Sequence, residues 1–156
     1  VQDNVGVARI LSLMRQSRPH VVITFGPDGI SGHLDHIAVH HCTTGAFDRY
    51  QQEMDYGQRL YYIDPTEATR QGCGVAPAAE TLGGPVDFID VEPYLVQKLQ
   101  AAQQQQSQNP TFSGDPEMEA QNMTCHELFR LARPQLAANG QEPEDDLFAA
   151  FSGSKQ

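Results

Sequence analysis

A short run of β-branched and aromatic residues that ends in a glycine-rich turn most constrains the fold of this chain. Residues 20–25 read His-Val-Val-Ile-Thr-Phe, and Gly-Pro-Asp-Gly follows at 26–29. A nearly continuous apolar run of this length indicates a buried strand of a parallel sheet. Gly, Pro and Asp are the residues of tight turns. The pattern therefore predicts an inner parallel strand whose carboxyl end leads through a turn into a helix that starts near His33.

Helical and strand patterns alternate along the rest of the chain, which is typical of an α/β protein. A first helix should bury Val5, Ile10, Leu11 and Met14, and end before Pro19. The helix after the turn should bury Ile37, Val39 or His40, and Phe47. The other expected elements are strands over 60–63 and 86–91, a helix from Pro93 through Gln106, and a helix from Thr124 to about Arg133, where Thr124 and Glu127 have capping-box spacing.

Composition narrows the class of protein and of partner. The 156 residues carry a formal net charge of −10, which argues against a nucleic-acid or anionic-membrane partner. The three cysteines form no CxxC pair, so we expect reduced thiols and a cytoplasmic protein. No apolar run approaches the roughly 20 residues needed to cross a bilayer. Acidic residues gather late, so residues 136–156 are expected to form a flexible tail.

Three polar residues at the start of the predicted second helix are candidates for chemistry. His33 and His36 are neighbours at i and i+3, so both imidazoles can approach one point. The carboxylate of Asp35 can hydrogen-bond a nearby imidazole, which fixes its tautomer and favours its charged form. A neutral imidazole can ligate zinc, and a charged one can hold a proton near a carbonyl. The same triplet also fits a solvent-facing helix start, and His40 fits either a further ligand or a packing residue.

The stretch from Arg18 to Val39 resembles the second signature of the PIG-L/LmbE-like N-acetylglucosaminyl deacetylases. In that family a strand and a glycine-rich turn lead into Gly-His-Pro-Asp-His at the start of a helix. Further similar segments are Ile89–Lys98, Lys98 with Ala101, Ser107 and Gln108, and Glu127-Leu-Phe129. The resemblance runs from about Arg9 to Phe129. It departs at Leu34, where the family has proline, at Gln105, where it has histidine, and in lacking the first signature, Ala-His-Pro-Asp-Asp-Glu.

This resemblance implies a fold, a reaction and roles for the triplet. The fold would be a Rossmann-like, mostly parallel sheet with flanking helices, present only in part. Residues 1–135 would be the C-terminal part of a LmbE-like deacetylase domain. His36 would be one zinc ligand, and the other ligands and the catalytic base would come from a missing N-terminal segment or a second chain. His33, oriented by Asp35, would act on the substrate.

The implied activity is zinc-dependent removal of the acetyl group from a small molecule that contains N-acetylglucosamine. The chain alone is then expected to be inactive, and an oligomer is compatible with the pattern. The loop from Asp64 to Pro85 is either a contact for the aglycone or a plain connector. The alternative function is a non-catalytic, degenerate α/β module or a partner-binding subunit that keeps only the scaffold.

Overall fold

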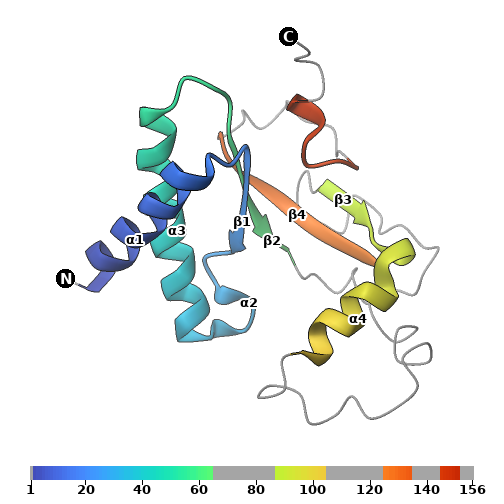
Figure 1. The fold of residues 1–156 in the computed structure, drawn as a ribbon. Helices are drawn as coiled ribbons and strands as arrows, with labels where there is room; N and C mark the ends of the chain where they lie inside the picture. The colour runs from blue at the N-terminus through green and yellow to red at the C-terminus, as the bar shows by residue number, and fades with distance from the viewer. Residues whose placement is uncertain (1, 65–86, 105–124, 135–144, 152–156) are drawn as a thin grey trace.

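The computed structural model describes residues 2–64, 87–104, 125–134 and 145–151 of the 156. Helices and short strands alternate, as the sequence predicts (Figure 1). In chain order the elements are α1 (Gln2–Ser17), β1 (Val21–Phe25), α2 (Gly29–Gly32), α3 (Leu34–Glu53), β2 (Arg59–Ile63), β3 (Asp87–Asp90), the 3-10 turn η3 (Glu92–Tyr94), α4 (Leu95–Gln103), β4 (His126–Arg133) and η4 (Ala149–Phe151).

The four strands form one mixed sheet in the order β1-β2-β4-β3. β1 and β2 run parallel, with Val21 beside Arg59 and Phe25 beside Ile63. β4 lies antiparallel to both β2 and β3. The prediction of a mostly parallel sheet is therefore wrong for the part of the chain that the structure describes. The strand over 21–25 is confirmed, but it lies at the edge of this sheet rather than inside it.

The helix predicted from Thr124 to Arg133 is wrong, because residues 126–133 form the strand β4. Leu128, Phe129 and Ala132 are all buried, because β4 lies between two other strands and has packing on both faces. A strand buried in this way has no clear alternation of apolar and polar residues. The capping-box spacing of Thr124 and Glu127 was a local signal, and strand pairing overrides it.

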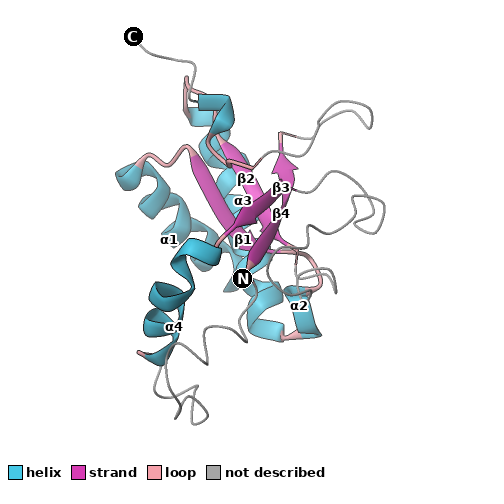
Figure 2. Cartoon of the chain, turned by 90° about the vertical axis from the view of Figure 1, so that its right-hand side faces the viewer, coloured by secondary structure: helices cyan, strands magenta, loops and turns pink. Residues whose placement is uncertain are grey.

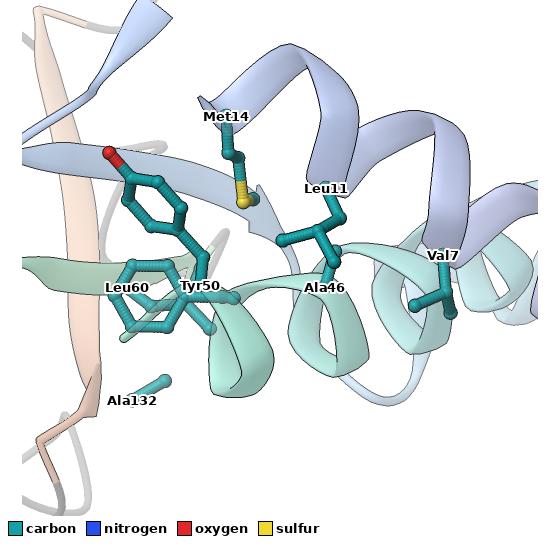
Figure 3. Close-up of a cluster of buried hydrophobic side chains, with 8 residues drawn as sticks. Val7, Leu11, Met14, Ala46, Tyr50, Leu60 and Ala132 are labelled. Carbon is teal, nitrogen blue, oxygen red and sulfur yellow. The ribbon is translucent and has the colours of Figure 1, made fainter. Parts of the chain in front are cut away.

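One face of the sheet is covered by α1 and α3, which pack against each other (Figures 1 and 2). Figure 3 shows this core, where side chains of both helices meet those of β2 and β4. Its buried members are Val7, Leu11, Met14, Ala46, Phe47, Tyr50, Leu60 and Ala132. The predicted stripe of the first helix is confirmed at Leu11 and Met14, whereas Val5 is 55% exposed and Val7 takes its place.

On the opposite face of the sheet, the described part of the acidic C-terminal stretch packs on β2 and β4. Leu147 is buried against Tyr61 and Phe129. The Tyr61 hydroxyl lies 2.9 Å from Arg59 Nη1 and 3.5 Å from the carbonyl oxygen of Leu147. Residues 145–151, which fall in the expected flexible tail, are thus anchored to the domain.

The remaining expectations meet the structure in part. The helix predicted from Pro93 begins with the turn η3 and continues as α4 to Gln103. The loop predicted over 64–85 lies, apart from Asp64, outside the described residues. Cys125 is disulfide-bonded, which corrects the expectation of reduced thiols and removes that argument for a cytoplasmic location. None of the described helices has the length and apolarity that a membrane span requires.

Candidate functional site

The candidate site is built on the sharp turn between β1 and α3. Asp28 accepts a hydrogen bond from the backbone N–H of Ile30 at 3.2 Å, which closes the start of the turn. Gly29 and Gly32 have φ of +61° and +74°, and Ile30 between them has φ of +68°. Positive φ is rare for a β-branched residue and costs of order 1–3 kcal/mol, so the surrounding structure must hold this turn in place.

His33 caps the N-terminus of α3. Its Nδ1 accepts the backbone N–H of Asp35 at 3.2 Å, so the ring is the neutral tautomer with its proton on Nε2. The sequence predicted instead that the Asp35 carboxylate holds a charged imidazole. Within the described ranges no hydrogen bond or ion pair joins that carboxylate to a histidine, and Asp35 is exposed. Asp35 therefore positions His33 through its backbone.

His36 is fixed by two contacts with the segment that precedes it. Its Nδ1 lies 3.1 Å from the carbonyl oxygen of Gly29, and its ring stacks on Phe25 with centroids 4.0 Å apart. A carbonyl can only accept, so Nδ1 is the donor here, and in the neutral form of the ring Nε2 keeps its lone pair. A metal-ligating histidine usually donates its other N–H to a carbonyl or carboxylate in this way. The His33 ring lies close by, with a centroid distance of 4.8 Å.

The next two histidines of α3 have different surroundings. His40 is 7% exposed, its Nδ1 lies 2.9 Å from the carbonyl oxygen of Phe25, and its ring packs edge-on to Tyr62. His41 is exposed. The packing interpretation of His40 is thus confirmed, and α3 brings only His33 and His36 together at the turn.

The described residues do not by themselves form a complete metal site. No three His, Cys, Asp or Glu side chains gather closely enough to hold an ion within ranges 2–64, 87–104, 125–134 and 145–151. In its neutral form, the Nδ1-protonated ring of His36 offers Nε2 as a single nitrogen donor, the kind of donor that zinc accepts.

A cavity of about 410 Å³ adjoins the same turn and was missed by sequence reasoning. Its lining residues come from the turn, the end of β2 and the middle of β4: Gly26, Pro27, Asp28, Tyr62, Ile63, Asp64 and Arg130. Arg130 donates to Asp64 from both Nε and Nη2. The position of Asp64 directly after a strand was a usable signal. Arg130 had none, because its strand was predicted as a helix.

Comparison with known proteins finds no family model that matches the chain. Curated relatives do match, all over short stretches. The chain is 54% identical over 75 residues to the 1D-myo-inositol 2-acetamido-2-deoxy-alpha-D-glucopyranoside deacetylase of Rhodococcus jostii, covering 44% of this chain and 25% of the relative. Proteins of the same name from Mycobacterium sp. and Saccharomonospora viridis are each 37% identical over 67 residues, with 20% and 24% of their length covered. The chain thus spans a quarter or less of these relatives.

Proposed function

We propose that this chain is part of a zinc-dependent hydrolase of the PIG-L/LmbE-like family that removes the acetyl group from a small molecule containing N-acetylglucosamine. The observation that carries the proposal is the 54% identity over 75 residues to a deacetylase of such a molecule. The arrangement of His33 and His36 at the turn after β1 supports it, because ligands of open α/β sheets bind beyond the carboxyl ends of parallel strands.

In this proposal His36 holds the metal through Nε2. The hydrogen bond from Nδ1 to Gly29 and the stack on Phe25 fix the ring before any metal binds. Such preorganisation lowers the cost of ligation. Zinc bound there would supply a water of lowered pKa and polarise the acetamide carbonyl.

His33 acts on the substrate. With Nδ1 occupied by the N–H of Asp35, its Nε2–H is the available donor. That donor stabilises the negative charge that develops on the acetamide oxygen when water attacks the carbonyl carbon. Cleavage of the C–N bond, with the proton that the base took from water delivered to the departing nitrogen, then gives acetate and a free glucosaminyl amine. Asp35 is a positioning residue, because its backbone orients His33.

The remaining ligands and the base that takes the proton of water come, in this proposal, from outside the described residues, either in a longer chain or in a partner chain. The alternative, a non-catalytic module that keeps the scaffold, is favoured by one observation: the described residues contain no cluster of three side chains that could hold a metal ion. The two candidates differ in whether this segment supports turnover in a complete site.

A chimera tests the proposal. The matched 75-residue segment of the Rhodococcus jostii deacetylase is replaced by the corresponding segment of this chain. We expect the chimera to bind zinc and to release acetate from the substrate in that relative's name. The unaltered relative and a chimera carrying His41→Ala, an exposed histidine of the same helix, serve as controls. A folded chimera without zinc-dependent acetate release would favour the non-catalytic module.

A further inference from the structure

We propose that the cavity beside the turn binds an uncharged, polyhydroxylated ring and discriminates against anionic groups. Resting on the proposed function, this assigns the cavity to the part of the substrate that is not cleaved. The inference comes from which residues line the cavity, how they are paired and where the cavity lies relative to His36.

The cavity and His36 share one turn. Gly26, Pro27 and Asp28 line the cavity, and the next residue, Gly29, holds Nδ1 of His36 through its carbonyl oxygen. On the other side, Tyr62 of β2 pairs in register with Arg130 of β4. Tyr62 also contacts α3, through its hydroxyl to Thr44 at 3.2 Å and its ring to His40. A ligand in the cavity would therefore lie next to the segment that carries both candidate histidines.

The charges that line the cavity do not favour an anion. Among the described lining residues, two carboxylates, Asp28 and Asp64, face one guanidinium, Arg130, and their formal charges sum to −1. Arg130 also forms an ion pair with Asp64, in which its Nε and Nη2 both donate to one oxygen, Oδ2. An incoming phosphate or carboxylate would have to compete with that ion pair and approach a second carboxylate.

Hydroxyl groups suit the same lining. Carboxylate oxygens accept from hydroxyls, and within the described residues no hydrogen bond reaches Oδ1 of Asp64. Pro27, Tyr62 and Ile63 add apolar surface for the C–H face of a ring. The volume of about 410 Å³ lies in the range of small-molecule sites, about 300–1,000 Å³. A sugar or cyclitol ring matches this combination, whereas a charged headgroup does not.

Titration of the ¹⁵N-labelled full chain followed by NMR tests the inference. The probes are myo-inositol and myo-inositol monophosphate, at equal ionic strength. We expect myo-inositol to shift the amide signals of 26–28, 62–64 and 130, and the phosphate to bind at least ~10-fold more weakly. Asp64→Asn removes the carboxylate that pairs with Arg130. It should weaken myo-inositol binding and reduce the ratio of the affinity for myo-inositol to the affinity for the phosphate. Asp28→Asn, which removes the second carboxylate, should also reduce that ratio.

Asp55→Asn is the matched control, because Asp55 is exposed and lines a different cavity, with His20 and Tyr56. It should leave both affinities unchanged. The inference is overturned if myo-inositol shifts no signals or shifts signals elsewhere, or if the phosphate binds as tightly as myo-inositol. The experiment needs neither metal nor turnover, so its result is independent of the chimera. If myo-inositol binds in the cavity but the chimera releases no acetate, the proposed function is contradicted and this inference stands. If the chimera releases acetate but myo-inositol does not bind in the cavity, this inference is contradicted and the proposed function stands.

Discussion

Gly29 is the residue at which backbone geometry and the candidate site meet. A Cβ there would lie 2.9 Å from Ile37 Cγ1 and 3.1 Å from His36 Cβ, and φ is +61°. Gly29→Ala should therefore lower the free energy of unfolding by about 1–3 kcal/mol. The matched control is Gly32→Ala, with φ of +74° but no atom within 4 Å of the added Cβ. Urea denaturation measures the free energy of unfolding of both variants. Equal decreases would show that contact of the added Cβ with His36 and Ile37 does not contribute to the loss of stability.

A variant of Asp35 tests whether the backbone N–H or the carboxylate of this residue orients His33. In the active chimera, Asp35→Asn keeps the N–H that bonds Nδ1 of His33. We therefore expect a smaller fall in kcat than for His33→Ala, for which losing a positioned donor costs about 10²–10⁴-fold. Steady-state kinetics measures both variants. A loss as large as that of His33→Ala would mean that the carboxylate itself orients or charges the imidazole.

Tyr61 gives the fold a specific weakness at alkaline pH. Burial raises its pKa to about 12, against about 10 for an ordinary tyrosine, and Arg59 and Asp87 act on it with opposite signs. The folded state binds this proton more tightly than the unfolded state, so the contribution of Tyr61 to the free energy of unfolding is fully present below pH 10. This contribution falls as the pH rises toward 12, by up to about 3 kcal/mol.

Urea titrations of the wild type and Tyr61→Phe between pH 9 and 12 measure this effect. The variant loses the buried hydroxyl, so its stability should decline less steeply with pH, whatever its stability at pH 8. Burial and the hydrogen bond to Tyr56 also raise the pKa of Tyr50, so some alkaline decline should remain in the variant. Parallel curves for the two proteins would contradict the assignment to Tyr61.

Sequence could predict part of the site, namely that His33 and His36 are neighbours after a strand and a turn. Helical spacing and turn residues are local signals, and they sufficed for this pair. Spacing could not tell which atom of Asp35 contacts His33, because the cap depends on the backbone geometry at the start of α3. Nor could it find the pairing of Arg130 with Asp64, which are 66 residues apart and meet only through the sheet.

At the scale of elements, the packing of α1 on α3 should provide much of the stability. Leu11 is 6% exposed in the core between these helices, whereas Leu13 on the same helix is 62% exposed. Leu11→Ala should lower the free energy of unfolding by about 2–5 kcal/mol because it leaves a cavity. Leu13→Ala should change it by less than about 0.5 kcal/mol. Equal effects in chemical denaturation would mean that α1 does not pack on α3 as described.

The errors in predicted elements share one physical cause. Helices α1 and α3 and strands β1 and β2 were predicted because each has a local pattern and a local end, such as Pro19 or the turn at 26–29. β4 was predicted as a helix because its identity depends on β2 and β3, its distant partners. The mostly parallel sheet was then wrong as well, since β4 provides both antiparallel pairings.

At the scale of the whole molecule, the turn between β1 and α3 links three features. It orients His36, leads into the cap made by His33 and forms one wall of the cavity. The helices α1 and α3 pack on one face of the sheet, and Leu147 packs on the other. In the proposed function this turn provides part of the metal and substrate site, and the other ligands come from outside the described residues.

Zinc content of the chimera is the most direct test of the central claim that His36 is a metal ligand and His33 is not. Elemental analysis after dialysis should find about one zinc per chain in the chimera and in its His33→Ala and His41→Ala variants. His36→Ala should hold far less, because a three-ligand site loses one ligand. If His36→Ala kept its zinc, or if His33→Ala lost it, the assignment of the two histidines would be contradicted.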